Sequence, residues 1–362
     1  MSIESDLKKE GIEITSKLDT LKVNTLAKNI AQKLVYAFPE HDFKLGELFI
    51  QLSKLDMYLA NITKGLSEAN YHYKNNAIYF NQTIPFEKIT DFAIHECIHY
   101  LQTKKDKQGH LIRLGLCDLT KFKLHGLGLN EAAVQLASSK ALKSPKESVK
   151  YYGIGFSTIS PNCYPIECNL IEQMAYITGE YVLFDSTFHS TDDFKQKFIA
   201  LTDTKTFATL EDNFDKLLLE EETLIKLGNK LEQEEKVLTV KKITKEIETT
   251  KKKIQTLFIE SQNLILSSYF DHAFSQITNL EEVENYRRKL YHYKDKIGTI
   301  EDYHFFNDYY ITMMTKLEQT YLRIEQGQPL TEVGLVKPNQ FLRIFQMLKK
   351  LFFRFGKEYK KE

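Results

Sequence analysis

Two early segments carry apolar residues at the three- and four-residue spacing of amphipathic helices. One runs from Thr25 to Phe38 and is followed directly by Pro39, and the other runs from Leu45 to Ile62. Side chains at this spacing share one face of a helix, and a proline ends a helix because it has no amide hydrogen to donate. We therefore predict two packing helices, preceded by a polar, loosely helical stretch over residues 1–22.

Aromatic residues alternate with other residues on either side of Asn75 and Asn76, in the segment from Tyr71 to Phe80. Alternation of this kind is typical of a strand, and asparagine tolerates the positive φ that a tight turn requires. The segment predicts a β-hairpin.

The second half of the chain lacks helix breakers. Residues 166–328 contain no proline, and the only glycines between residues 180 and 326 are Gly228 and Gly298. Leucines recur every seven residues, and lysine and glutamate fill many of the positions between them, as on the solvated faces of a helical hairpin or coiled coil. An antiparallel pair within one chain, with its turn near Gly228 or Thr239, is favoured over dimerisation; the leucines are Leu217, Leu224, Leu231 and Leu238.

The composition argues against a nucleic-acid-binding, a secreted or a membrane-spanning protein. The 362 residues include 49 basic and 49 acidic side chains, so no overall field favours nucleic acid. The polar first residues do not resemble a signal peptide, and no apolar window is long enough to span a membrane. The four cysteines do not form a disulfide framework and fit a reduced, cytoplasmic setting; they are Cys97, Cys117, Cys163 and Cys168.

The last 25 residues, 338–362, form a basic amphipathic pattern. Seven lysines and arginines stand among apolar residues, against only Glu358 and Glu362. Such a helix suits the inner face of an anionic membrane, but docking on this protein or on a partner protein is the favoured alternative, because amphipathic helices are common. The oligomeric state does not follow from the sequence.

The chemistry is concentrated in the run from Asp91 to Gln102, which contains His95-Glu96-Cys97-Ile98-His99. On a helix, His95 and His99 lie one turn apart on one face and can bind one metal ion. Glu96 lies beside them, where a carboxylate can accept a proton from a water molecule that the metal activates. Apolar neighbours predict that the helix is buried, and buried polar groups need partners.

A third metal ligand is available downstream. Glu131 follows His99 by 32 residues, which is enough chain for a loop and a returning helix. Catalytic zinc sites use three protein ligands and leave one position for water, whereas structural sites use four. Two histidines and one glutamate therefore predict a catalytic Zn²⁺ site.

These residues, His95-Glu96-Cys97-Ile98-His99 followed by Asn130-Glu131-Ala132-Ala133-Val134-Gln135, resemble the gluzincin, or thermolysin-like, branch of the zincin metallopeptidases. The resemblance covers roughly residues 45 to 180, and it extends to uncharacterised zincin-like proteins of low-GC Gram-positive bacteria, which suggest no substrate. It implies that His95, His99 and Glu131 bind zinc and that Glu96 is the general base. It also implies that an edge strand, here the hairpin near residues 71–80, borders the cleft and pairs with an extended peptide.

Several further residues are candidates for supporting roles. Many thermolysin-like enzymes have an aspartate four residues after the ligand glutamate, hydrogen-bonded to the first histidine. Gln135 occupies that position here and can accept the same hydrogen bond without a charge. Asp91, one turn before His95, is a second candidate for orienting a ligand. The candidate donors to a transition-state oxyanion are Tyr152, Tyr164 and His125.

The sequence thus predicts an α+β, predominantly helical protein. We expect a zincin-like metal-binding domain with a small β-hairpin or sheet over residues 1–205, a helical hairpin or bundle over 206–335, and a basic tail over 336–362. The predicted function is a zinc-dependent hydrolase that cleaves peptide or protein substrates. The alternative is a metal-bearing scaffold without catalysis, which binds a partner or a membrane surface through its helical half and tail.

Overall fold

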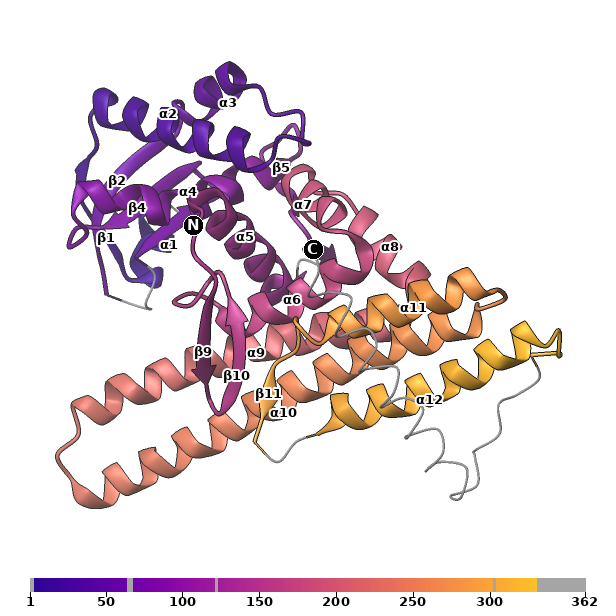
Figure 1. Ribbon diagram of the computed structural model, residues 1–362. Coiled ribbons are helices and arrows are strands. Elements are labelled where there is room, and N and C mark those ends of the chain that lie inside the picture. The colour runs from indigo at the N-terminus through magenta and orange to yellow at the C-terminus, as the bar shows by residue number, and fades with distance from the viewer. Residues whose placement is uncertain (1–2, 64–67, 121–122, 302–303, 331–362) are drawn as a thin grey trace. The chain divides into compact units, whose positions relative to one another are not determined.

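The computed structural model describes residues 3–63, 68–120, 123–301 and 304–330. Over these residues the chain has α+β structure and is predominantly helical, as predicted (Figure 1). Within the same residues, no helix combines the length and the hydropathy that a membrane crossing requires. The predicted basic tail over 338–362 lies outside the described residues.

The chain divides into two compact units, and the division differs from the expected domain boundaries. Unit 1 comprises Met1–Tyr269 and Asp295–Tyr303, and unit 2 comprises Phe270–Lys294 and His304–Glu362. The expected boundary at residue 205 therefore lies inside unit 1.

The first 62 residues form more strand than their sequence pattern indicates. Their elements are α1 (Ile3–Glu10), β1 (Ile12–Lys17), α2 (Thr20–Ala37), α3 (Leu45–Leu52) and β2 (Asp56–Ile62). The prediction of one helix from Leu45 to Ile62 is wrong after Leu52, because β2 pairs with β1 on one side and with β4 on the other. Residues 3–22, predicted to be loosely helical, form α1, β1 and the start of α2.

A four-stranded sheet lies at the centre of this part, in the order β1-β2-β4-β3. Strands β3 (Ala69–His72) and β4 (Ala77–Asn81) are antiparallel, and the turn between them contains Asn76 with φ 52°. The predicted hairpin is confirmed. On one face Leu7 of α1 packs against Ala77 and Tyr79. Ile78 and Phe80 project to the other face, because successive side chains of a strand alternate, and both are fully buried.

Helices α4 (Phe86–Gln102) and α5 (Leu127–Leu142) are the two elements that carry the predicted ligands. Helix α4 packs against β3 and β4, and α5 packs against α4. The chain between them forms four short strands in two antiparallel pairs, namely β5 (Thr103–Lys105) with β6 (Leu111–Leu114) and β7 (Asp118–Thr120) with β8 (Lys123–His125).

The rest of unit 1 begins with the antiparallel strands β9 (Glu147–Tyr151) and β10 (Ile154–Thr158), which β11 (Thr299–Ile300) extends. The helices that follow β10 are α6 (Pro165–Thr178), α7 (Glu180–His189), α8 (Asp193–Leu201), α9 (Thr204–Glu232) and α10 (Val237–Ser275). Helices α6 and α7 both pack against α5.

The long helices α9 and α10 run antiparallel within one chain (Figure 1). Asn213 Nδ2 donates a hydrogen bond to Ser261 Oγ at 3.1 Å, and Lys253 Nζ lies 3.0 Å from Glu220 Oε1. The predicted intramolecular helical pair is therefore present. Its turn occupies residues 233–236, between the two predicted positions, and Gly228 lies within α9.

Unit 2 combines the end of α10 with α11 (Leu280–Tyr293) and α12 (Phe305–Glu325). Phe270 makes edge contacts with Tyr286 and Tyr293, whose ring centroids both lie 5.5 Å away. Arg287 joins α11 to α12 through Glu318 at 3.3 Å. Among the aromatic residues of α11 and α12, Tyr286 and Tyr293 are buried, Tyr291 is exposed, and the others are half-buried.

Helix α9 fixes the start of α5. Helix α5 follows Gly126, which has no side chain to cap it, and Asp215 of α9 supplies the cap instead. The Gly126 and Gly128 amides donate to the two oxygens of the Asp215 carboxylate at 3.0 and 2.9 Å. A Cβ at Gly128 would lie 2.2 Å from the Phe214 carbonyl oxygen, so only glycine permits this close approach of α5 to α9.

We predict that Asp215→Ala lowers the free energy of unfolding by about 1–2 kcal/mol, because two amides at a helix start lose a charged acceptor. Urea unfolding measures the change. Asp212→Ala is the matched control, since Asp212 is an exposed residue of the same helix that forms an ion pair with Lys216 one turn away. An equal loss in both variants would contradict the capping role.

Candidate metal centre

Helix α4 presents the two histidines on one face. No glycine or proline interrupts it, and Ala93, Ile94 and Ile98 are fully buried, which fixes the rotation of the helix about its axis. His95 and His99 consequently lie side by side, with ring centroids 4.7 Å apart and Nε2 atoms 3.0 Å apart.

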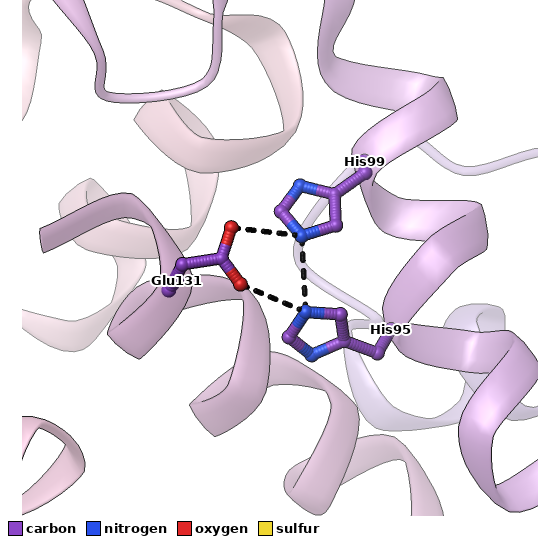
Figure 2. Close-up of side chains that lie close together, drawn as sticks. All are labelled: His95, His99 and Glu131. Atoms are coloured by element: carbon purple, nitrogen blue, oxygen red, sulfur yellow. Dashed lines mark hydrogen bonds and ion pairs between the residues drawn. The ribbon is translucent and has the colours of Figure 1, made fainter. Parts of the chain in front are cut away.

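Helix α5 brings the third group to the same point. Glu131 lies in its second turn, and its carboxylate faces both imidazoles (Figure 2). Its Oε2 is 3.2 Å from His95 Nε2, and its Oε1 is 3.3 Å from His99 Nε2. The three groups offer one ligand atom each within 4.8 Å of one another. Their side chains are 9–15% exposed, so the cluster is largely buried.

The charges of this cluster are mutually stabilising. Burial alone would raise the pKa of the Glu131 carboxyl, but the charge of His99 and the hydrogen bond with His95 hold it below its ordinary value. Burial alone would lower the pKa of His95, but its hydrogen bond with Glu131 and the charge of Glu96 raise it to about 9. Without a metal, the raised pKa of His95 favours its protonated form beside the carboxylate. A divalent cation would displace that proton on binding.

Gln135 sets the orientation of His95. Its Oε1 lies 2.9 Å from His95 Nδ1, while its Nε2 donates to Ser160 Oγ at 2.9 Å. The Ser160 hydroxyl in turn donates to the Cys163 carbonyl, so it can only accept from Gln135. The amide oxygen therefore faces Nδ1–H of His95. With Nδ1 engaged by Gln135, Nε2 is the nitrogen that faces Glu131 and that a metal ion would bind once its proton is displaced.

Glu96 lies outside the three-residue cluster, between α4 and the edge strand β3. Its Oε2 accepts a hydrogen bond from the Tyr71 amide at 2.7 Å. This amide points away from β4, so Glu96 binds the outer edge of the sheet. The Glu96 carboxylate is thus held outside the cluster of His95, His99 and Glu131.

Among the predicted oxyanion donors, Tyr164 is the one that the structure brings to the site. It precedes α6 with φ 47°, and its ring centroid lies 6.2 Å from that of His95. The charge of Glu131, followed by burial and the charge of Glu96, raises the pKa of the Tyr164 hydroxyl well above its ordinary value. The hydroxyl therefore stays protonated and can donate.

The structure places the other candidates elsewhere. Tyr152 lies in the turn between β9 and β10, where its carbonyl accepts a hydrogen bond from Gln255 of α10. Burial, followed by the charges of Glu221 and Glu167, raises the pKa of its hydroxyl. His125 ends strand β8, where it pairs with Asp118. Asp91 is on α4 but exposed to solvent, and within the described residues it makes no hydrogen bond with His95.

Several contributing groups have little or no sequence signal. The Tyr71 amide is a backbone donor, and Ser160 belongs to no motif. Gln102 is different, because it follows His99 by three residues and so shares its helix face. Its Nε2 lies 2.7 Å from His99 Nδ1. Helical spacing alone would have identified it as a neighbour.

Comparisons with protein-family models, with curated proteins and with solved structures found no match. The assignment of the site therefore rests on the residues and their geometry.

Two buried carboxyl groups outside the cluster, Glu167 and Glu221, lead to a prediction of how stability depends on pH. Burial raises the pKa of Glu167 and Glu221, and the charge of Glu167 raises that of Glu221 further. A carboxyl with a raised pKa in the folded chain costs stability as the pH rises from its ordinary pKa through the raised one. We expect Glu167→Gln to be more stable than wild type at pH 8, by on the order of 1–2 kcal/mol, and this advantage to vanish below about pH 4.

Thermal unfolding of both proteins across this pH range measures the effect. Glu147→Gln, which alters an exposed glutamate of β9, should show no such dependence. A stability difference that does not grow with pH would refute the explanation.

Proposed function

We propose that this protein is a zinc-dependent hydrolase, most simply a peptidase, in which His95, His99 and Glu131 bind the metal and Glu96 is the general base. The observation that carries the proposal is the meeting of three ligand atoms from α4 and α5 within 4.8 Å.

The donor set fits zinc. Two imidazoles and one carboxylate are ligands that Zn²⁺ accepts, and a three-ligand site leaves one position for water. Within the described residues, no fourth histidine, cysteine or acidic side chain completes the group. Gln135 orients His95 in the tautomer that a ligand requires. These features favour a catalytic over a structural role for the metal.

The residues around the cluster supply the remaining chemistry. Bound zinc would acidify a water molecule and polarise the carbonyl of the substrate. Glu96 would accept the proton of the attacking water and deliver it to the leaving amine. The Tyr164 hydroxyl, held protonated beside Glu131, would donate a hydrogen bond to the oxyanion that develops on the substrate.

Strand β3 suits a peptide substrate. It is an edge strand of the four-stranded sheet, and the Tyr71–Glu96 hydrogen bond holds its outer edge beside the metal helix. The Tyr71 amide on this edge is already bound by Glu96, so an extended peptide would pair with the neighbouring backbone groups of β3 or take the Tyr71 amide from Glu96. Either mode of pairing would bring the peptide's carbonyls near the site.

The first test is metal content. Protein purified without chelator should carry about one zinc per chain, and His99→Ala or Glu131→Gln should reduce zinc affinity by more than tenfold, because either change removes a ligand. Elemental analysis and competition with a chromophoric chelator measure both. His110→Ala, which alters an exposed histidine, is the control. Wild-type protein that binds no zinc would overturn the proposal.

The second test separates catalysis from metal binding. Glu96→Gln should retain zinc and its fold but lose about 10²–10⁴-fold in kcat/KM, the range expected for removal of a general base. Cleavage of a peptide library, followed by mass spectrometry, identifies substrates and rates. Glu87→Gln, on the same helix but exposed, should cleave like wild type. Absence of cleavage by zinc-loaded wild type would instead favour the scaffold alternative.

A further inference from the structure

A pair of buried side-chain amides lies behind His99. Gln102 is the last residue of α4 and is fully buried, with its Nε2 2.7 Å from His99 Nδ1. Asn130 directly precedes the ligand Glu131 on α5 and is also fully buried. Each residue is therefore attached to one of the two helices that carry metal ligands.

The two amides meet at Gly115, in the turn after β6. A Cβ there would lie 2.1 Å from Gln102 Oε1 and 2.1 Å from Asn130 Oδ1, so both oxygens press against this glycine and lie close to each other. Asn130 Oδ1 also accepts a hydrogen bond from the Leu116 amide at 3.0 Å. Gly115 has φ +53°, which no larger residue would adopt without strain in this space.

The surrounding chain holds this arrangement firmly. The Gly115 amide donates to Ser190 Oγ at 2.8 Å, and the Ser190 hydroxyl donates to the Gln102 carbonyl. Arg113 donates to the Gly115 carbonyl and forms an ion pair with Asp192 at 2.7 Å. The Gln102 side chain is thus enclosed by fixed neighbours.

The hydrogen bonding of Gln102 Oε1 indicates which way the Gln102 amide is oriented. With Nε2 toward His99, Gln102 Oε1 has no hydrogen-bond partner among the described residues and instead lies near the Asn130 oxygen. A buried acceptor without a donor costs about 1–3 kcal/mol. Half a turn of the amide exchanges its two ends. In that orientation Oε1 would accept from His99 Nδ1–H, and Nε2 would face Asn130 Oδ1, which has a lone pair that the Leu116 amide does not use.

We propose that Gln102 is a positioning residue for the metal: its amide oxygen fixes His99 with the proton on Nδ1, and its amide nitrogen ties this orientation to Asn130 beside Glu131. The inference rests on the proposed metal-binding role. It makes the two histidines equivalent, because each then donates Nδ1–H to a glutamine oxygen and directs Nε2 to the ion. It also couples the ligands on α4 to the ligand on α5 through one hydrogen bond.

The experiment compares zinc affinity and histidine tautomers in three variants. Gln102→Leu removes both hydrogen bonds and should weaken zinc binding 10–100-fold. Gln102→Glu keeps the acceptor for His99 but loses the donor to Asn130, so it should retain more zinc affinity than Gln102→Leu and less than wild type. Gln51→Leu changes an exposed glutamine of α3 and should leave affinity unchanged. Chelator competition measures affinity, and far-ultraviolet circular dichroism verifies that each variant is folded.

A measurement on the wild type keeps the test independent of folding. In ¹⁵N-labelled, zinc-loaded protein, long-range ¹H–¹⁵N correlation should show His99 with a protonated Nδ1 and zinc at Nε2. Zinc at Nδ1, or unchanged zinc affinity in Gln102→Leu, would overturn the role of Gln102 alone. Wild-type protein without zinc affinity would overturn the metal assignment itself.

Discussion

The Glu131 carboxylate facing two imidazoles is the interaction on which the centre of unit 1 depends. Three polar groups are largely buried between α4 and α5, where each would be costly without a partner. The packing of the two helices brings the three groups together, and the hydrogen bond with Glu131 raises the pKa of His95 against the effect of burial.

This interaction requires α5 to have a fixed position along the axis of α4. Helix α9, more than 60 residues later in the sequence, helps to fix that position. Asp215 of α9 receives two amides at the start of α5, and Gly128 allows the two backbones to touch. Helix α9 therefore caps the start of α5 in addition to packing against it. It belongs to the unit that positions Glu131, which explains why the structural division does not fall where the long helices begin.

The side chains that contact the Nδ1 atoms of the two histidines are neutral amides. Gln135 and Ser160 orient His95, and Gln102 contacts His99. A carboxylate in either position would make its imidazole a stronger ligand, and an amide gives orientation without that added charge. The charged residues Glu96 and Glu131 are thereby left as the acidic groups close to the cluster. Such a separation of roles suits a site in which one carboxylate must bind and another must exchange protons.

The sequence by itself determined the features that are encoded locally. The four-residue spacing of His95 and His99 placed them on one helix face, and the turn at Asn76 followed from the tolerance of asparagine for positive φ. Tertiary structure decided the rest. Residues 56–62 carry a helical pattern but form a strand, because pairing with two neighbours outweighs local periodicity. Only the fold could select Tyr164 among many tyrosines or bring Gln102 to Asn130, since such contacts depend on packing between distant segments.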